Sequence, residues 1–527
     1  MVAGVELPIN TNATAMQMAQ EIFGSGVNVV SASYSGDRDS SGIFTNGNAI
    51  APGVTPGDRG VMFSTGDLSG FTNNNWWQSN TSSSTTTSSS GINNNSMFNA
   101  AAGARTYDAS FIDVDFIPTG SMLTMQFVFA SEEYPEYAIG SYQDFVGVWI
   151  NGTQVHLGVG DGDVDPNNLN AGANQNLFID NTGDQYNTEM DGFTVTMTLK
   201  IPVNANVVNS IRIGIADVND ANYDSTLLIA GDSLQGALLA NDDTSNLYPT
   251  GSKTIDVLAN DTDFTGGILQ ITHINGQLVL PGDTVVLSTG QQVKLNTDGT
   301  LTMTGDGDVE SFSFTYTIET SNGLNDVGFV LVDSVPCFVA GTRISTPDGD
   351  VPVERLRPGD LVLTRDDGPQ PLRWIGERRV AAEGAFAPIF IAANAFGRHG
   401  ALFLSPLHRV LIRDSLAELL FGEAEVLVAA RDLVNGRTVR RIEGGLVDYV
   451  HILFDRHQVV FSEGLETESF LPGPQTARSF EAEIVAEICA LFPEIDPATG
   501  RGYSPAARRT LKPYEARLLM AQAGEAA

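Results

Sequence analysis

Cys337 is one of only two cysteines in this 527-residue chain, and it follows Val335 and Pro336 at a point where the composition changes. A thiol here can attack the carbonyl of Pro336, which belongs to the peptide bond on its own N-terminal side. A free thiol has a pKa of about 8.5, so it must lose its proton to a base or lie in a cationic setting. The leaving amine must also be protonated, and the oxyanion needs hydrogen-bond donors.

The residues after Cys337 form an all-β pattern with three polar blocks. These blocks are Pro358-Gly359-Asp360, Ser405-Pro406-Leu407-His408 and Asp455-Arg456-His457, each next to a predicted strand. Together with the opening cysteine they resemble, in order, the Hint domain shared by hedgehog proteins and inteins. The most similar subtype is the one found at the end of bacterial secreted proteins. The resemblance runs from Cys337 to Gly473 and implies a β horseshoe that cleaves its own chain.

The resemblance also implies a role for each block. Cys337 is the nucleophile, and His408 protonates the nitrogen of Cys337 as the peptide bond breaks. Ser405 stands where the family more often has Thr, and its hydroxyl holds the scissile peptide or the oxyanion. Asp455 and His457 help to activate the thiol or the attacking water. The thioester is then hydrolysed or passed to an external nucleophile.

Each of these residues also has a purely structural explanation. Cys337 can be a small buried apolar residue, as free cysteines often are, and His408 a hydrogen-bonded core histidine. His451 lies four residues before Asp455, and on an unbroken strand that spacing places both on one side, so His451 competes for the late role. No His-Asn pair followed by Cys, Ser or Thr closes the domain. The side chain that performs C-terminal cyclisation is therefore missing, which predicts cleavage rather than splicing.

The first 236 residues alternate short apolar runs with Gly, Asn, Asp and Ser, which is typical of a β-sandwich or jelly roll. A helix is predicted at Asn12–Phe23, a hairpin turn at Asn151-Gly152 and a flexible loop over Ser79–Ser90. The runs Phe127–Tyr137 and Asn219–Ser225 resemble the choice-of-anchor L family of bacterial surface and secreted proteins. That resemblance implies a sandwich in an exported protein and no agreed activity.

Two acidic groups in this region predict calcium ligands. Glu132, Glu133 and Glu136 follow one predicted strand, and Asp217, Asp220 and Asp224 lie around the end of another. Carboxylates on loops beside backbone carbonyls suit a hard cation; a solvated acidic rim is the alternative. The run Asp161–Asp165 resembles part of a calcium loop but lacks the glutamate at its twelfth position. Carboxylate pairs also run glycosidases, but nothing in the sequence fixes their separation.

Residues 237–332 predict a second, smaller β-sandwich. The order of its Asn- and Asp-rich turns and aromatic strand resembles the cadherin-like or immunoglobulin-like modules of large bacterial secreted proteins. Carboxylates near the junction of such modules bind calcium, and a solvated polar turn is the alternative. The positions that carry over are Asp242, Asp243, Asn260, Asp261 and Asp263. A single copy does not imply a long adhesive stalk.

The formal charge of the chain is -35, and only seven of its 28 Lys and Arg residues precede Cys337. An acidic surface argues against nucleic acid as a partner, and it fits calcium and a soluble exported protein. Two cysteines cannot form a disulfide framework. No apolar run approaches the roughly 18–20 residues that cross a bilayer, and the N-terminus lacks the features of a cleaved signal. We therefore expect any export signal to lie elsewhere, such as at the C-terminal end.

The sequence thus predicts an all-β protein with four parts. These are a jelly-roll-like β-sandwich (1–236), an Ig- or cadherin-like β-sandwich (237–332), a Hint-type β horseshoe (333–473) and a short helical tail (474–527), with helices at Arg478–Phe492 and Ala506–Ala521. In the favoured function, an extracellular or cell-surface protein cleaves its own Pro336–Cys337 bond without a cofactor and holds structural Ca²⁺ elsewhere. Its N-terminal segment is the substrate, and water or a small or surface nucleophile accepts the acyl group. In the alternative, the Hint domain is inert and the chain is a calcium-stabilised adhesion protein.

Overall fold

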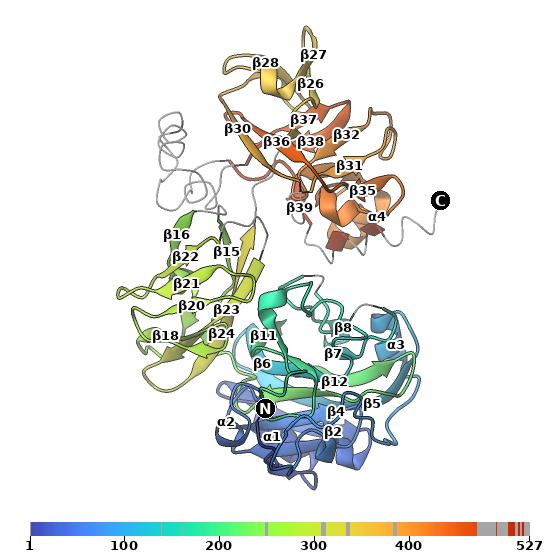
Figure 1. Ribbon diagram of the computed structural model, residues 1–527, viewed down its shortest axis with the longest axis vertical. Helices are drawn as coiled ribbons and strands as arrows, with labels where there is room; N and C mark the ends of the chain where they lie inside the picture. Colours follow the sequence, from blue (N-terminus) through green and yellow to red (C-terminus); the bar gives the residue numbers. More distant parts are fainter. Residues whose placement is uncertain are drawn as a thin grey trace. The chain divides into compact units, whose positions relative to one another are not determined.

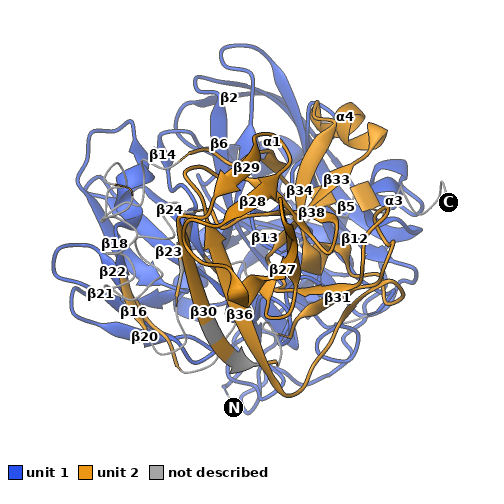
Figure 2. Cartoon of the chain, turned by 90° about the horizontal axis from the view of Figure 1, so that it is seen from above, with its two compact units in different colours: residues 1–243, 254–302, 312–331 blue, residues 244–253, 303–311, 332–527 orange. Residues whose placement is uncertain are grey.

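The computed structural model describes residues 2–138, 140–160, 162–247, 251–306, 312–333, 338–382, 387–471, 492, 504–511, 515–516 and 519–520. The chain divides into two compact units, coloured separately in Figure 2. Unit 1 contains residues 1–243, 254–302 and 312–331, and unit 2 contains residues 244–253, 303–311 and 332–527. Strands dominate both units (Figure 1), so the all-β prediction is confirmed. Within the described ranges, no helix is long and apolar enough to span a bilayer.

Two antiparallel sheets form the first part of unit 1. The larger has the order β1-β3-β4-β13-β6-β10-β9, with β11 also paired to β6: β1 (Ile9–Asn10), β3 (Ser41–Thr45), β4 (Arg59–Ser64), β13 (Ser225–Ala230), β6 (Met122–Ser131), β10 (Gly192–Thr194), β9 (Phe178–Asp180) and β11 (Met197–Pro202). The smaller has the order β2-β5-β12-β7-β8: β2 (Val27–Ser35), β5 (Thr106–Pro118), β12 (Asn209–Val218), β7 (Phe145–Ile150) and β8 (Thr153–Gln154).

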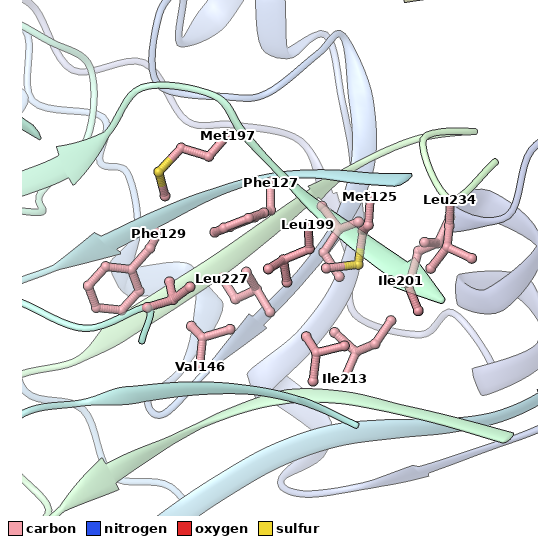
Figure 3. Close-up of a cluster of buried hydrophobic side chains, with 14 of the residues drawn as sticks. Met125, Phe127, Phe129, Val146, Met197, Leu199, Ile201, Ile213, Leu227 and Leu234 are labelled. Carbon is pink, nitrogen blue, oxygen red and sulfur yellow. The ribbon is translucent and has the colours of Figure 1, made fainter. Parts of the chain in front are cut away.

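The core of this sandwich is made by apolar side chains from both sheets, shown in Figure 3. Met125, Phe127 and Phe129 alternate along β6 and therefore share one face of it. They meet Leu199 of β11 and Ile213 of β12, and none of the five is more than 2% exposed. Burying a side chain of this size contributes about 1.5–3 kcal/mol, which favours the two-layer arrangement.

Local signals in the sequence set several elements of unit 1. Helix α1 (Ala15–Ile22) begins after Thr14, whose hydroxyl accepts the N–H of Gln17 while the Gln17 side chain accepts the N–H of Thr14. The predicted helix is confirmed. Its buried residues are Met18, Ala19 and Ile22, and Met16 is half-buried. Asn151 and Gly152 have positive φ (49° and 84°) and join β7 to β8, as the hairpin prediction requires.

The other labelled helical segments of the described residues, in both units, are α2 (Gly47–Ile50), α3 (Ser96–Ala102), α4 (Ser415–Phe421), η1 (Arg38–Ser40), η2 (Leu68–Gly70), η3 (Gln175–Leu177), η4 (Val257–Asn260), η5 (Val353–Arg355) and η7 (Ala430–Leu433).

The Ser- and Thr-rich segment 79–90 contains no helix or strand, but it is attached along its length to carboxylates. The Ser79 hydroxyl and the Asn80 backbone N–H both donate to Asp184 (2.6 and 3.0 Å). Three further carboxylates accept bonds from this segment: Glu189 from Thr81, Asp224 from Thr87 and Asp37 from Ser90. The segment is a strap held by hydrogen bonds, whereas the sequence predicted a flexible loop.

The middle of the chain folds as small sheets. A five-stranded sheet has the order β15-β24-β23-β18-β19: β15 (Asp243–Asn246), β24 (Asn325–Asp333), β23 (Phe312–Thr320), β18 (Leu269–Ile274) and β19 (Gln277–Leu278). A four-stranded sheet has the order β16-β22-β21-β20: β16 (Ser252–Ile255), β22 (Leu301–Thr304), β21 (Gln292–Leu295) and β20 (Thr284–Val286). A short pair joins β14 (Leu238–Leu239) to β17 (Thr262–Asp263).

The remainder of unit 2 has two larger sheets. The six-stranded sheet has the order β30-β36-β25-β32-β31-β35: β30 (Trp374–Ala381), β36 (Leu446–Leu453), β25 (Phe338–Val339), β32 (Leu402–Leu404), β31 (Ile389–Ile391) and β35 (Val439–Arg441). The nine-stranded sheet has the order β27-β26-β37-β38-β33-β34-β39, with β28 paired to β29 and β37: β27 (Gly349–Pro352), β26 (Arg343–Thr346), β37 (Val459–Ser462), β38 (Leu465–Glu468), β33 (Arg409–Arg413), β34 (Glu425–Ala429), β39 (Arg509–Thr510), β28 (Leu361–Thr364) and β29 (Gly368–Pro371).

The C-terminal tail differs from its prediction where the structure describes it. Of the helix predicted at Arg478–Phe492, only Phe492 lies within the described residues. In the region of the second predicted helix, Arg509–Thr510 form β39, which pairs in parallel with β34. Residues 515–516 and 519–520 are helical. The strand forms because β34 offers an open edge whose backbone groups need partners.

Candidate functional site

Phe338 is the described residue that follows the predicted scissile bond, since Pro336 and Cys337 themselves lie outside the described residues. Phe338 is the first residue of β25 and is 1% exposed. It pairs with Leu404 of β32 on one side and Val450 of β36 on the other. Both pairings are antiparallel, so the next residues on the partner strands, Ser405 and His451, lie toward the end of β25 that leads to Cys337.

A tight turn places His408 against Phe338. The N–H of His408 donates to the carbonyl of Ser405 (3.0 Å), and Ala430 N–H donates to the carbonyl of His408 (2.9 Å). The rings of His408 and Phe338 are 4.3 Å apart between centroids. Ser405 and His408 are both buried, at 3% and 2% exposure. The fold thus brings the predicted serine and histidine to the residue that directly follows Cys337.

His451 and Asp455 do not share one face of a strand, contrary to the spacing argument. Strand β36 ends at Leu453, so Asp455 lies in the following turn. Its side chain is 58% exposed and forms an ion pair with Arg373 (3.3 Å). His451 is buried instead, with the rings of Trp374 and Phe470 at 6.4 and 5.3 Å.

His457 is held by the C-terminal tail and by the end of β38. Its Nδ1 accepts the N–H of Ala507 (2.9 Å), and its own backbone N–H donates to the hydroxyl of Ser504 (2.8 Å). With Nδ1 as acceptor, the hydrogen is assigned to Nε2, which donates to the carbonyl of Ser469 (3.1 Å). Nε2 is also 3.4 Å from Glu468. Both ring nitrogens of His457 are therefore engaged by protein groups.

Glu468 is a buried carboxylate that the sequence reasoning did not select. It ends β38 with 0% exposure and accepts the N–H of Arg409 (2.9 Å) and the Arg409 guanidinium (3.1 Å). Burial alone would raise the pKa of Glu468, but the charges of Arg409, His457 and His408 lower it to about 2. Its position in the sequence is a signal: Glu468-Ser469 stands where a splicing intein closes with His-Asn.

The acidic residues predicted as calcium ligands in unit 1 are mostly buried rather than on a solvated rim. Glu132 and Glu133 are 0% and 2% exposed, and Asp224 is 6% exposed, while Asp220 is half-buried. Burial raises the pKa of Glu132 to about 9 and that of Glu133 to about 10. Asp224 accepts the backbone N–H and hydroxyl of Thr87.

A further buried carboxyl, Asp144, lies beside Glu133 and beside Asp217 of the second predicted acidic group. The backbone N–H of Asp144 donates to Glu133 (3.2 Å), and Asp144 and Asp217 are 1% and 4% exposed. Burial raises the pKa of Asp144 to about 8, and burial and the charge of Asp144 raise that of Asp217 well above its usual range. Among the described residues, nothing forms a hydrogen bond with Asp144 Oδ2 or Asp217 Oδ1.

The residues predicted as calcium ligands in the middle module lie in two separate groups. Asp242 pairs with Lys200, and Asn260 donates to the carbonyl of Asp242 (3.2 Å). Asp261 accepts the N–H of Asn241 and the hydroxyl of Tyr316 (2.7 and 3.1 Å). Burial raises the pKa of Asp243 to about 7 and that of Asp261 to about 6. Asp263 instead accepts the N–H groups of Thr265 and Gly267 in a turn of its own.

No group of three or more His, Cys, Asp or Glu side chains in the described part of the chain is arranged to hold a metal ion. The carboxyls of Glu133, Asp144 and Asp217 nevertheless lie close enough to perturb one another. Calcium binding therefore stays a prediction for both sets of residues.

Comparison with known proteins assigns a family to each of three segments. Residues 336–474 match the Hint domain, residues 8–235 the Choice-of-anchor L domain and residues 235–333 the Bacterial Ig domain. The resemblances predicted for these segments are confirmed. Unit 2 therefore contains a Hint-type domain, and the anchor domain indicates a surface or secreted protein.

The search of curated proteins found no match. Among solved structures, the chain is similar to the gp41-1 intein (11% identity) and to the Msm DnaB1 intein splicing domain bound with zinc (15% identity). Each alignment covers 25% of this chain and 98% of the other, with a TM-score of 0.17.

Proposed function

We propose that this protein is exported and cleaves its own Pro336–Cys337 bond through an N–S acyl shift. The observation that carries the proposal is the packing of the His408 ring on Phe338, the residue after Cys337, at 4.3 Å. The nitrogen that leaves on cleavage is the backbone nitrogen of Cys337, one residue from that ring. A general acid has to reach the leaving nitrogen directly or through one water.

In the proposed reaction, His408 moves one proton and no net proton is consumed. Its neutral imidazole accepts the thiol proton of Cys337, and the sulfur bonds to the carbonyl carbon of Pro336. The imidazolium then protonates the nitrogen of Cys337 as the C–N bond breaks, so a thiol and an amide become a thioester and an amine. Water attacks the thioester, which leaves a carboxylate on Pro336 and restores the thiol.

Ser405 and His451 are placed to assist this reaction. Each follows a residue paired with Phe338, and each is buried, at 3% and 6% exposure. We assign the Ser405 hydroxyl to the scissile peptide or its oxyanion, since a donor there stabilises developing charge. His451 suits the late role better than Asp455, because the carboxylate of Asp455 faces solvent and pairs with Arg373.

The test is expression of the full chain followed by separation and mass measurement of its fragments. The expected products end at Pro336 and begin at Cys337, and added hydroxylamine or thiol accelerates their formation. Cys337→Ala abolishes them, whereas Cys489→Ala, the matched change at the other cysteine, leaves them. A wild-type chain that stays whole through prolonged incubation with hydroxylamine overturns the proposal and leaves the adhesion protein with an inert Hint domain.

A further inference from the structure

We propose that Glu468 is a positioning residue for this cleavage, because its buried carboxylate is the counter-ion that allows His408 to carry a proton. The inference rests on the proposed function and adds a residue that no motif of the chain marks. Glu468 acts through the imidazole of His408.

The contacts of Glu468 fix it beside the element that carries His408. Strand β38 pairs with β33 at Thr467 and Val410, and the N–H of Arg409 donates to Glu468 (2.9 Å). Arg409 is the residue after His408, so this bond ties the carboxylate to the backbone of the catalytic turn. Glu468 is fully buried, and a single conformation is therefore imposed on its side chain.

Three cationic or titratable groups face this carboxylate: Arg409, His457 and His408. The Arg409 side chain is 30% exposed, so solvent screens its charge. His457 lies against the same carboxylate, with its Nε2 3.4 Å from Glu468. Glu468 is 0% exposed, so its charge is screened less than that of Arg409, and a nearby anion favours imidazolium over imidazole.

The reaction needs that imidazolium inside a buried site. His408 is 2% exposed, and burial disfavours the charged form of an imidazole. Without the anion, proton transfer from the thiol to His408 creates a cation with little compensation. The carboxylate therefore supports the step in which His408 holds the proton before the C–N bond breaks.

The first experiment compares two isosteric neutral substitutions on β38 in the full chain. Glu468→Gln removes the proposed counter-ion. Glu466→Gln removes a carboxylate two residues away, which pairs with Arg365 and Arg413 and is 18% exposed. We expect Glu468→Gln to move the acid side of the pH–rate profile for cleavage down by about 1 pH unit, because His408 must start neutral to accept the thiol proton, and Glu466→Gln to leave it in place. An unshifted profile in a folded Glu468→Gln chain overturns the inference.

The second experiment needs no cleavage and separates this inference from the proposed function. In a Cys337→Ala background, the titration of His408 is followed by NMR of the six histidines, assigned with His408→Gln. Adding Glu468→Gln should lower its midpoint by about 1 pH unit. If Glu468→Gln lowers the midpoint of His408 but the wild-type chain never cleaves, the proposed function alone is rejected. Cleavage with an unchanged midpoint rejects the role of Glu468 alone.

A folding failure of Glu468→Gln is answered by a double variant. Glu468→Met with Arg409→Met removes both charges together, and replacing a buried ion pair by apolar residues is often tolerated. The midpoint of His408 should again fall. An unchanged midpoint in the folded double variant overturns the inference as well.

Discussion

Glu468 in unit 2 and Asp144 in unit 1 are both carboxyl groups with almost no solvent exposure (0% and 1%), yet they differ in charge. Burial favours the neutral form of each. At Glu468 the charges of Arg409, His457 and His408 outweigh burial, and its pKa is lowered to about 2. Asp144 lies among carboxyls, and its pKa is raised to about 8. Burial is the main cause of the raised pKa of Asp144, so the two carboxyls differ because neighbouring Arg and His side chains outweigh burial at Glu468.

The two arrangements suit different tasks. A single compensated anion can stabilise a transient positive charge, which is what acid–base chemistry at His408 requires. Carboxyls without a cation must instead share protons or take up a cation, because several buried anions repel one another. Glu133, Asp144 and Asp217 are buried carboxyls of this kind.

The largest expected effect is a fall in the stability of unit 1 as pH rises in the absence of divalent ions. A carboxyl whose folded pKa is raised stabilises the fold fully below its unfolded pKa of about 4, and this contribution is lost as pH rises through the folded value. For Asp144 and Glu133 the window runs from about pH 4 to about pH 8 and about pH 10. One such carboxyl changes stability by at most about 1.4 kcal/mol per pH unit.

Hydrogen exchange of the full chain between pH 5 and pH 8, in EDTA, measures this loss in unit 1. Asp144→Asn should reduce the slope, and Glu468→Gln should not, since Glu468 loses its contribution only as pH falls from about 4 towards its folded pKa of about 2. Added Ca²⁺ should restore protection at pH 8 if these carboxyls are its ligands. Equal protection with and without Ca²⁺ would reject the calcium prediction while leaving the proton-sharing account in place.

The second effect in size is the loss of the cation beside Glu468. Arg409→Gln leaves a buried carboxylate with only its backbone and histidine contacts. Removing one partner of a buried pair costs about 3–5 kcal/mol, and we expect about 2 kcal/mol here because the Arg409 side chain is partly exposed. Urea unfolding followed by fluorescence of Trp374, which lies in unit 2, measures it in a Trp76→Phe, Trp77→Phe and Trp149→Phe background. Arg413→Gln, at an exposed pair on the same strand β33, is the matched control and should cost under about 1 kcal/mol.

Local pattern predicted the elements of this protein well. Strand β7 spans Phe145–Ile150, the bounds that its apolar run predicts, and the cap at Thr14 and turn at Asn151-Gly152 act within a few residues. The block from Ser405 to His408 was also recognised from its own residues. These features depend on residues a few positions apart, so a short stretch of the sequence is enough to predict them.

The carboxyls that decide the comparison could not be predicted in the same way. Glu468 is an anion because β38 pairs with β33 and brings Arg409 to it across 59 positions of the chain. Burial raises the pKa of Asp144 to about 8, and its backbone N–H donates to Glu133 of another strand end. The sequence pattern of a strand predicts that a polar residue lies on the surface. Only the pairing of strands that are distant in the sequence shows that such a residue is buried. The same limit made the strap at 79–90 look flexible, since its carboxylate partners are distant in sequence.

The smallest effect concerns a carboxylate held by a hydroxyl instead of a cation. Asp224 accepts the hydroxyl of Thr87 (2.6 Å), and its pKa is raised to about 6 by burial while the Thr87 bonds oppose the rise. Thr87→Val keeps the shape and removes the hydroxyl, which should cost about 1 kcal/mol and raise the pKa of Asp224 further. Thr86→Val is the neighbouring control, because its hydroxyl bonds backbone groups rather than a carboxylate. The contrary result is that Thr87→Val leaves both the hydrogen-exchange protection of the strap and the pH dependence of that protection unchanged. In that case the Thr87 hydroxyl does not affect the pKa of Asp224, and only charged neighbours explain the difference between buried carboxyls.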